Sequence, residues 1–449
     1  MKYIFLTLFS CTCLTLFGQI ATDTLQHERD EYNLGFEKVS PVSNSSVSWN
    51  TGTTKSGFKI GIDSVEKHRG KYALSIENID QNVSSNYGMT GMFIPAKFEG
   101  SEVEIKFYLK MQNVKEHVDF PFRIDDEDND KLQFTNLLAK RIYGTQDWKQ
   151  YSLKLPLQKE AAKIYLFPML YGPGKIWIDD IQVLIDGVDI SQARVKANYN
   201  PNAPKPISYG NNAVASGRVK TKDAELYYEI YGKGEPLLLL HGNSQSINVF
   251  KKQIKELSKS YKVIAVDTRG QGNSSDHTLE PLSYNLYAED MKVLLDSLHI
   301  RKANILGWSD GGNIGLIMAA KYPGYVNKLA ITGACTNPNE AVSANTLAEV
   351  AKAIESLKAK SDEKSKYQIR LFTMLLNEPH ITVADLNKIK ASVLVMAGEK
   401  DMILENHTRF IAANIIKAQL FIFKGASHYV PVENPIEFNK QVLSFLESR

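Results

Sequence analysis

A glycine-flanked serine between an apolar run and a helical run constrains the fold of this chain most. The segment is Asn304-Ile305-Leu306-Gly307-Trp308-Ser309-Asp310-Gly311-Gly312-Asn313, and apolar residues 314–320 follow it. This pattern predicts a strand, a sharp turn and a helix, with a strained serine whose hydroxyl is exposed above the strand ends. Glycines are expected at the turn because a Cβ there would clash. The helix N-terminus favours negative charge at the serine. The alternative is an ordinary glycine-rich turn with a solvent-exposed serine.

Around this segment, strands and helices alternate along the second half of the chain. Strands are predicted at 226–231, 237–240, 263–266, 329–331, 393–397 and 420–423, and helices at 247–257 and 286–298. This alternation predicts a mostly parallel sheet with helices on both faces.

Between Gly333 and about Asn387 the strand pattern stops. Helical spacing at 347–357 and 367–376 predicts a short helical cap (about residues 334–387) over the strand ends, where ligands of such sheets bind. The alternative is a peripheral insertion that does not contact substrate.

A serine hydroxyl needs a base to take its proton and a third group to hold that base. Asp401 follows the predicted strand 393–397, and His428 follows the predicted strand 420–423. Each lies just past the carboxyl end of a buried strand, as Ser309 does, so we expect the side chains to meet. The order Ser, Asp, His is typical of hydrolases with this type of sheet. The alternative is that Glu399 is the acid and Asp401 a helix cap.

The motifs together resemble the α/β-hydrolase family over about residues 217–449. They are His241-Gly242-Asn243, Asp267-Thr268-Arg269-Gly270-Gln271-Gly272-Asn273-Ser274, Gly307-Trp308-Ser309-Asp310-Gly311-Gly312 and the Asp401/His428 pair. The resemblance implies Ser309 as nucleophile, His428 as general base and acid, and Asp401 as the orienting carboxylate. It also implies an oxyanion hole formed by the backbone N–H groups of Asn243 and Asp310, and no metal or organic cofactor.

The remaining polar residues of these motifs are expected to be structural. Asp267 and Arg269 are predicted to pin a loop, and His241 to pack beneath the oxyanion loop. His407 is predicted to lie in a surface helix.

Ser309 and the neighbouring Asp310 restrict the reactions that this family resemblance implies. Epoxide hydrolases and haloalkane dehalogenases of this family carry Asp where this chain has Ser309, which disfavours those reactions. The hexapeptide also resembles the elbow of valacyclovir hydrolases, in which the equivalent of Asp310 contacts a substrate ammonium. Asp310 therefore either selects α-amino esters or makes only a local hydrogen bond.

The interpretation is a carboxylesterase-like enzyme acting on a small-molecule ester through an acyl-enzyme. An amidase and a carbon–carbon bond hydrolase remain alternatives, because the triad does not distinguish acyl leaving groups.

Residues 22–187 show a different, all-β pattern. In residues 101–111, Val103, Ile105, Phe107, Leu109 and Met111 alternate with polar residues, which predicts a half-buried strand. Other strands are predicted at 72–76, 151–157, 163–167 and 176–185. Their spacing predicts a β-sandwich, and the segments 69–76 and 175–183 resemble jelly-roll, carbohydrate-binding-like modules.

Two features of the all-β part bear on ligands. Trp49, Tyr87, Trp148, Tyr165 and Trp177 are either a glycan-stacking platform or core packing. The acidic run 125–130 is either a calcium site or a solvated hairpin tip. If the aromatic residues form a platform, the accessory domain binds glycan, and a binding protein with an inactive hydrolase-like scaffold is the alternative to an enzyme.

The N-terminus indicates export. Residues 4–17 form an apolar run preceded by Lys2, the layout of a signal peptide that is too short for a membrane span. A lipoprotein signal at Cys11 is the alternative. Beyond the signal only Cys335 remains, so no internal disulfide is expected. These features favour a bacterial periplasm or cell surface.

The predicted organisation is multidomain. It comprises a signal peptide (1–21), a β-sandwich (22–187), a proline-rich linker (188–209) and an α/β-hydrolase domain (210–449). The formal net charge of +3 gives no electrostatic argument for binding nucleic acid.

Overall fold

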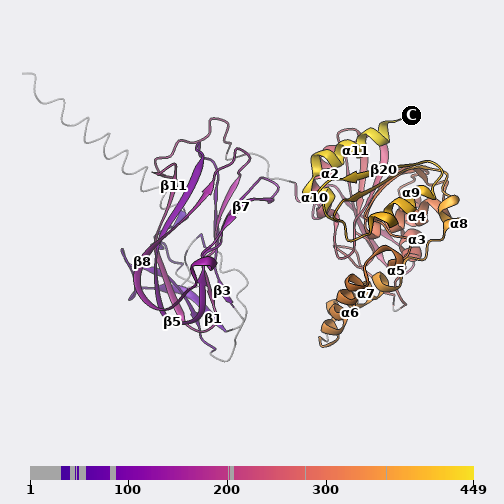
Figure 1. The fold of residues 1–449 in the computed structure, drawn as a ribbon. Helices are drawn as coiled ribbons and strands as arrows, with labels where there is room; N and C mark the ends of the chain where they lie inside the picture. Colours follow the sequence, from indigo (N-terminus) through magenta and orange to yellow (C-terminus); the bar gives the residue numbers. More distant parts are fainter. Residues whose placement is uncertain are drawn as a thin grey trace, which may run out of the picture. The chain divides into compact units, whose positions relative to one another are not determined.

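The chain forms two compact units, and the second begins at Ile207 (Figure 1). The computed structural model describes residues 32–40, 46, 48–49, 57–80, 87–200, 202, 207–278, 280–360 and 362–448. The predicted signal peptide lies outside the described residues. Within them, no helix combines the length and the apolar character that a bilayer crossing requires.

The described part of the first unit is built of antiparallel strands. The strands are β1 (Phe58–Asp63), β2 (Ala73–Asn78), β3 (Tyr87–Met89), β4 (Met92–Pro95), β5 (Glu102–Asp119), β6 (Phe122–Asp125), β7 (Lys131–Thr135), β8 (Ile142–Pro156), β9 (Lys163–Leu166), β10 (Met169–Tyr171), β11 (Lys175–Ile185) and β12 (Val188–Asp189), with one 3-10 turn, η1 (Leu138–Lys140). One sheet has the order β1-β2-β11-β5-β10-β3, with β8 on β5 and β12 on β11; the other has the order β4-β9-β6-β7. This confirms an all-β unit, while its jelly-roll character stays a prediction.

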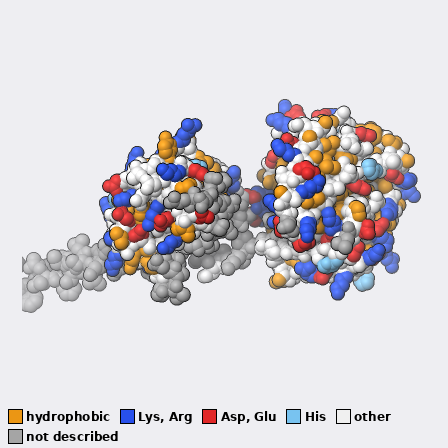
Figure 2. Space-filling model, turned by 90° about the horizontal axis from the view of Figure 1, so that it is seen from below, with side chains coloured by type: hydrophobic (Ala, Val, Ile, Leu, Met, Phe, Trp, Pro, Cys, Tyr) orange, Lys and Arg blue, Asp and Glu red, His pale blue; other side chains and the backbone are white. Residues whose placement is uncertain are grey.

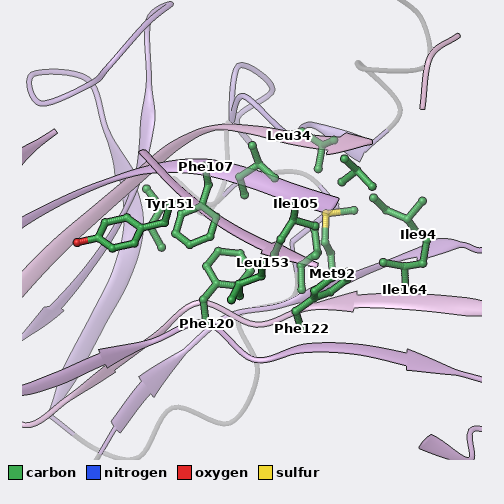
Figure 3. Close-up of a cluster of buried hydrophobic side chains, with 14 of the residues drawn as sticks. Leu34, Met92, Ile94, Ile105, Phe107, Phe120, Phe122, Tyr151, Leu153 and Ile164 are labelled. Carbon is green, nitrogen blue, oxygen red and sulfur yellow. The ribbon is translucent and has the colours of Figure 1, made fainter. Parts of the chain in front are cut away.

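The long strand β5 shows why the sequence folds this way. Its alternate residues from Val103 to Met111 are all buried and the residues between them are partly exposed, which confirms the predicted alternation. The buried side chains of both sheets form one apolar cluster, in which Phe107 stacks on Phe120 (Figure 3). Because every second side chain enters this cluster, the register of the strands is fixed.

The structure places the aromatic residues and the acidic run that were predicted as possible ligand sites of this unit. Trp49 and Trp177 are buried, so the five aromatic residues do not form one exposed platform. Tyr87, Trp148 and Tyr165 are half-buried. The acidic run is the tip of the β6–β7 hairpin, where Asp126 accepts hydrogen bonds from the backbone of Asp128 and Asp130.

The second unit contains a sheet with helices on both faces (Figure 1). Its strands are β13 (Ser216–Lys220), β14 (Glu225–Tyr231), β15 (Glu235–Leu240), β16 (Tyr261–Val266), β17 (Ala303–Trp308), β18 (Val326–Thr332), β19 (Ser392–Gly398) and β20 (Ala418–Phe423). Its helices are η2 (Ile247–Phe250), α2 (Lys251–Leu257), α3 (Tyr284–Ser297), α4 (Asp310–Lys321), α5 (Pro338–Ala341), α6 (Ala344–Lys358), α7 (Glu363–Asn377), α8 (Val383–Asn387), α9 (Glu405–Ala413), α10 (Val430–Glu433) and α11 (Pro435–Glu447).

The sheet has the order β13-β14-β16-β15-β17-β18-β19-β20, and from β16 onward its neighbours are parallel. Successive residues of a strand enter opposite cores: Leu238 packs with α3 and α4, and Leu239 packs with α2 and α11. Strands buried on both faces explain the continuous apolar runs in the sequence.

The interruption after β18 is helical, as predicted, and α6 and α7 form a hairpin that projects from the body of this unit (Figure 1). Helix α7 is tied to loops at the carboxyl ends of two strands. Tyr367 Oη donates to the Arg269 carbonyl (2.5 Å) after β16, and Gln368 Nε2 donates to Ser244 Oγ (2.7 Å) after β15. The cap therefore contacts the edge of the sheet where the predicted site residues lie.

The predicted linker, residues 188–209, contains ordered structure at both ends. β12 pairs with β11, and Ile190 is buried in the first unit. Tyr209 is buried in the second unit, where the Gly210 N–H donates to the fully buried Glu229 (2.8 Å).

Candidate active site

Ser309 lies in a strained turn between β17 and α4. Its backbone φ is 55° and ψ is −117°, an uncommon region for a residue other than glycine. A Cβ at Gly307 would meet the backbone of Gly311, and one at Gly311 would meet the backbone of Leu240. The predicted strand–turn–helix with its required glycines is thus present, and Ser309 is only partly buried.

His428 and Asp401 form a buried pair. His428 Nδ1 lies 2.7 Å from Asp401 Oδ1, and the exposed fractions of the two side chains are 9% and 1%. A carboxylate only accepts hydrogen bonds, so Nδ1 donates to Asp401, and in the neutral imidazole Nε2 is the nitrogen with a lone pair. The alternative acid, Glu399, is exposed and accepts instead from the Gly425 N–H (2.8 Å).

Contacts from β17 and β18 bring Ser309 and this pair to the same edge of the sheet. The Ser309 N–H donates to the Thr332 carbonyl (2.8 Å), and the next residue, Gly333, packs against the imidazole. A Cβ at Gly333 would lie 2.6 Å from His428 Cε1 and 3.4 Å from Asp401 Oδ2.

Trp308, the residue before Ser309, bonds to the backbone of His428. Trp308 Nε1 donates to the carbonyl of His428 (3.0 Å), and the Trp308 side chain is fully buried. The loop that carries His428 is therefore joined directly to the strand that carries Ser309.

The two predicted oxyanion-hole residues are joined by their side chains. Asn243 Nδ2 donates to Asp310 Oδ2 (3.0 Å), and the neighbouring Gly242 packs on Ser309, whose Cβ would lie 3.1 Å from a Cβ at Gly242. In the part of the chain that the structure describes, neither the Asn243 nor the Asp310 backbone N–H donates to a protein acceptor. Both N–H groups thus remain available beside the serine.

The Asp310 carboxylate also accepts from Tyr284 Oη (2.8 Å) through Oδ1, so both of its oxygens have donors. Its exposed fraction is 2%. Burial raises the pKa of Asp310 to about 6, although the hydrogen bonds from Tyr284 and Asn243 oppose the shift. The local hydrogen bond expected as one alternative for Asp310 is therefore present.

The loop after β16 is pinned as predicted. Asp267 accepts from the backbone N–H groups of Ile247 and Asn273, both at 2.7 Å. The Arg269 guanidinium makes a two-pronged contact with Asp290 (2.8 and 2.7 Å).

The two other histidines named from the sequence have different outcomes. His241 is buried, its Nε2 accepts from the Thr268 N–H (3.0 Å), and burial lowers its pKa to about 4. His407 lies in helix α9, which has an exposed face as predicted, but its side chain points to the inner face, has an exposed fraction of 4% and accepts from the Thr336 N–H (3.0 Å).

Several residues around the site had no signal in the sequence. Gln271 and Gln368 bond to Ser244, next to Asn243, and Tyr284 bonds to Asp310. Nothing in the local spacing of these three residues indicates these contacts. Gly333 had a weak signal, because a glycine directly after a buried strand often permits a close approach.

Comparisons with known proteins agree with this architecture. Residues 235–355 match the family described as the alpha/beta hydrolase fold. The human protein named serine hydrolase BPHL is 30% identical over 267 residues, which cover 55% of this chain and 91% of that protein. An Escherichia coli protein named 2-hydroxy-6-oxononadienedioate/2-hydroxy-6-oxononatrienedioate hydrolase is 26% identical over 288 residues, which cover 56% of this chain and 99% of that protein.

Solved structures are also similar to part of this chain. A hydrolase from Pseudomonas aeruginosa has 25% sequence identity and a TM-score of 0.45, covering 53% of this chain and 100% of its own.

Proposed function

Because the chain belongs to the α/β-hydrolase family, we propose that it is a serine hydrolase that cleaves a small-molecule ester through an acyl-enzyme. The observation that carries the proposal is the buried His428–Asp401 pair beside the strained turn of Ser309. Strain at a residue other than glycine persists only where the surroundings hold it, and it is typical of functional sites.

In the proposed reaction, His428 Nε2 takes the proton of Ser309 Oγ as that oxygen attacks the ester carbonyl. The backbone N–H groups of Asn243 and Asp310 stabilise the resulting oxyanion; losing one such donor typically costs about 2.7–4 kcal/mol of transition-state stabilisation. His428 then gives the proton to the leaving alkoxide. Water, activated by the same imidazole, releases the acid from Ser309.

The first test is covalent labelling with a fluorophosphonate probe. Labelling of the wild type but not of Ser309→Ala is expected. A wild-type protein that stays unlabelled and hydrolyses no ester would support the alternative, a binding protein with an inactive scaffold.

The bond that is cleaved needs a separate test, because the triad acts on several acyl groups. We expect esters to react faster than amides with the same acyl group. The similarity to proteins named dienedioate hydrolases makes a carbon–carbon bond hydrolase the second candidate. Turnover of a 2-hydroxy-6-oxo-dienoate, with no turnover of esters, would favour it.

We propose that Asp310 does not select α-amino esters over simple acyl esters. Both carboxylate oxygens of Asp310 already accept hydrogen bonds, so a substrate ammonium would have to compete with Tyr284 and Asn243. Equal kcat/KM values for paired acyl and aminoacyl esters are expected; a strong preference for the aminoacyl ester would contradict this.

We further propose that the protein is exported to the periplasm or cell surface and that the first unit binds glycan. The layout of residues 1–21 supports export. The glycan proposal rests on half-buried Trp148, which meets His68 edge-on at 5.7 Å, and on Tyr108, which stacks on His68 at 3.6 Å. Fractionation of the native host and retention on insoluble polysaccharides test these points.

A further inference from the structure

We infer that a hydrogen-bond chain of fixed direction couples cap helix α7 to the oxyanion hole, which makes Gln368 and the Asp310 side chain positioning groups. The inference rests on the proposed function, in which Asn243 and Asp310 supply the oxyanion donors. The position of helix α7 therefore determines the position of these two backbone N–H groups.

The chain runs through consecutive side-chain contacts. Gln368 Nε2 donates to Ser244 Oγ (2.7 Å), and Ser244 Oγ donates to Asn243 Oδ1 (2.8 Å). Asn243 Nδ2 donates to Asp310 Oδ2 (3.0 Å), and Tyr284 Oη donates to Asp310 Oδ1 (2.8 Å). The side chains thus link the cap, the loop after β15, the start of α4 and the start of α3.

The acceptor at the buried end fixes the direction of every bond. An ionised carboxylate has no proton to donate, so the amide nitrogen of Asn243 must face Asp310. The amide oxygen then faces Ser244 and needs a donor, which is the Ser244 hydroxyl. The hydroxyl has one proton, so the group on its other side must donate as well, and the Gln368 amide does.

The loop between the cap and the oxyanion hole is also strained. Ser244 has a φ of 59°, and its N–H donates to Gln271 Oε1 (2.5 Å). A left-handed residue other than glycine keeps its conformation only when its surroundings determine it. Loss of the Gln368 donor removes one of those determinants, next to the residue whose backbone N–H faces the oxyanion.

The solvent exposure of each side chain determines how strongly its substitution is expected to lower kcat. Ser244 is exposed and Gln368 is half-buried, and hydrogen bonds between such groups contribute about 1 kcal/mol or less. Asp310 and Tyr284 are buried, with exposed fractions of 2% and 0%. We therefore expect a small effect at Gln368 and a larger one at Tyr284.

The experiment uses the full chain with Gln368→Glu, which keeps the shape but replaces the donor by an acceptor. Ser244 should turn its proton toward the introduced carboxylate and release Asn243. We expect faster hydrogen exchange at residues 242–246, with kcat for an ester roughly threefold lower and KM unchanged. Gln368→Lys restores a donor and should restore both the wild-type hydrogen exchange at residues 242–246 and the wild-type kcat.

The matched control is Asn377→Asp, the same amide-to-carboxylate change on the exposed face of α7. The Asn377 side chain bonds only within its own helix, to the Thr373 carbonyl, so exchange at 242–246 and kcat should stay at wild-type values. Tyr284→Phe, at the buried end, should lower kcat further than Gln368→Glu does.

Two outcomes separate the inference from the function on which it rests. If Gln368→Glu leaves exchange at 242–246 unchanged, or if Gln368→Lys behaves like Gln368→Glu, the coupling is overturned. If wild-type Ser309 is not labelled by a fluorophosphonate, the proposed function fails, while the exchange data still decide whether α7 holds the loop.

Discussion

The two units of the chain differ in where they place polar side chains. In the second unit, parallel strands end at one edge of the sheet, and the loops there carry Asn243, Ser309, Gly333, Asp401 and His428. In the first unit, antiparallel strands turn at both ends, and polar residues alternate along the length of strands such as β5. A parallel sheet therefore brings polar loop residues together at one edge, whereas an antiparallel unit distributes them over its surface.

In the view of Figure 2, basic and acidic side chains are interspersed on the second unit, and no broad area of one sign is visible on that face. The difference between the units that bears on function is therefore sought in strand direction and loop position.

The largest effect is expected at the proposed triad. Ser309→Ala and Asp401→Asn should each lower kcat about 10⁴-fold or more, because the first removes the nucleophile and the second leaves His428 in the wrong tautomer. Glu399→Gln is the matched control, since Glu399 follows the same strand but bonds to Gly425. Loss of activity in Glu399→Gln with retention in Asp401→Asn would reverse the assignment of the acid.

A smaller effect is expected at Gly333, where any side chain would collide with His428. Gly333→Ala should lower kcat by about 10²-fold through misplacement of the imidazole. Gly425→Ala is the control: its φ is also positive (74° against 62°), but a Cβ there meets open space. That control should lose stability on the order of 1 kcal/mol and keep kcat. Equal losses of kcat would show that backbone strain, and not the collision, is responsible.

The positions of some of these residues could be predicted from the sequence, and those of others could not. The glycines around Ser309 carry a local signal, because the turn itself requires them. Asp401 and His428 were predictable from their places after buried strands, and their contact agrees with that logic, although their catalytic roles stay a prediction. Strand β13 was not predicted, because only Val219 of its residues is buried and no alternation results.

The bonds of Asp310 show the limit of such reasoning. Its partners Asn243 and Tyr284 lie 67 and 26 residues away along the chain. Nothing in the hexapeptide distinguishes an aspartate whose two oxygens already have protein donors from one that faces a substrate. His407 illustrates the same limit, since a short amphipathic helix does not specify how deeply its histidine packs.

Asp310 also predicts a pH effect on stability. Its pKa is raised to about 6, so between pH 6 and 4 the folded chain binds a proton that the unfolded chain does not. The contribution of this group to the free energy of unfolding therefore rises as the pH falls through that window, by at most about 1.4 kcal/mol per pH unit. Asp310→Asn lacks the contribution. Hydrogen exchange of β17 and α4 under denaturant, measured from pH 7 to 4.5, should show wild type gaining on the variant toward acid; a constant difference would contradict the raised pKa.

The smallest effect on catalysis is expected in the first unit. Each unit has its own apolar cores, so Trp148→Ala should leave kcat/KM for a soluble ester within about twofold of wild type. The same variant should lose retention on insoluble polysaccharide, because it removes the half-buried indole beside His68. Tyr143→Ala is the control, since Tyr143 lies on the same strand, β8, and is more exposed (66%). Retention lost equally in both variants would mean that the loss is not specific to Trp148, which would contradict the assignment of glycan binding to the Trp148–His68 contact.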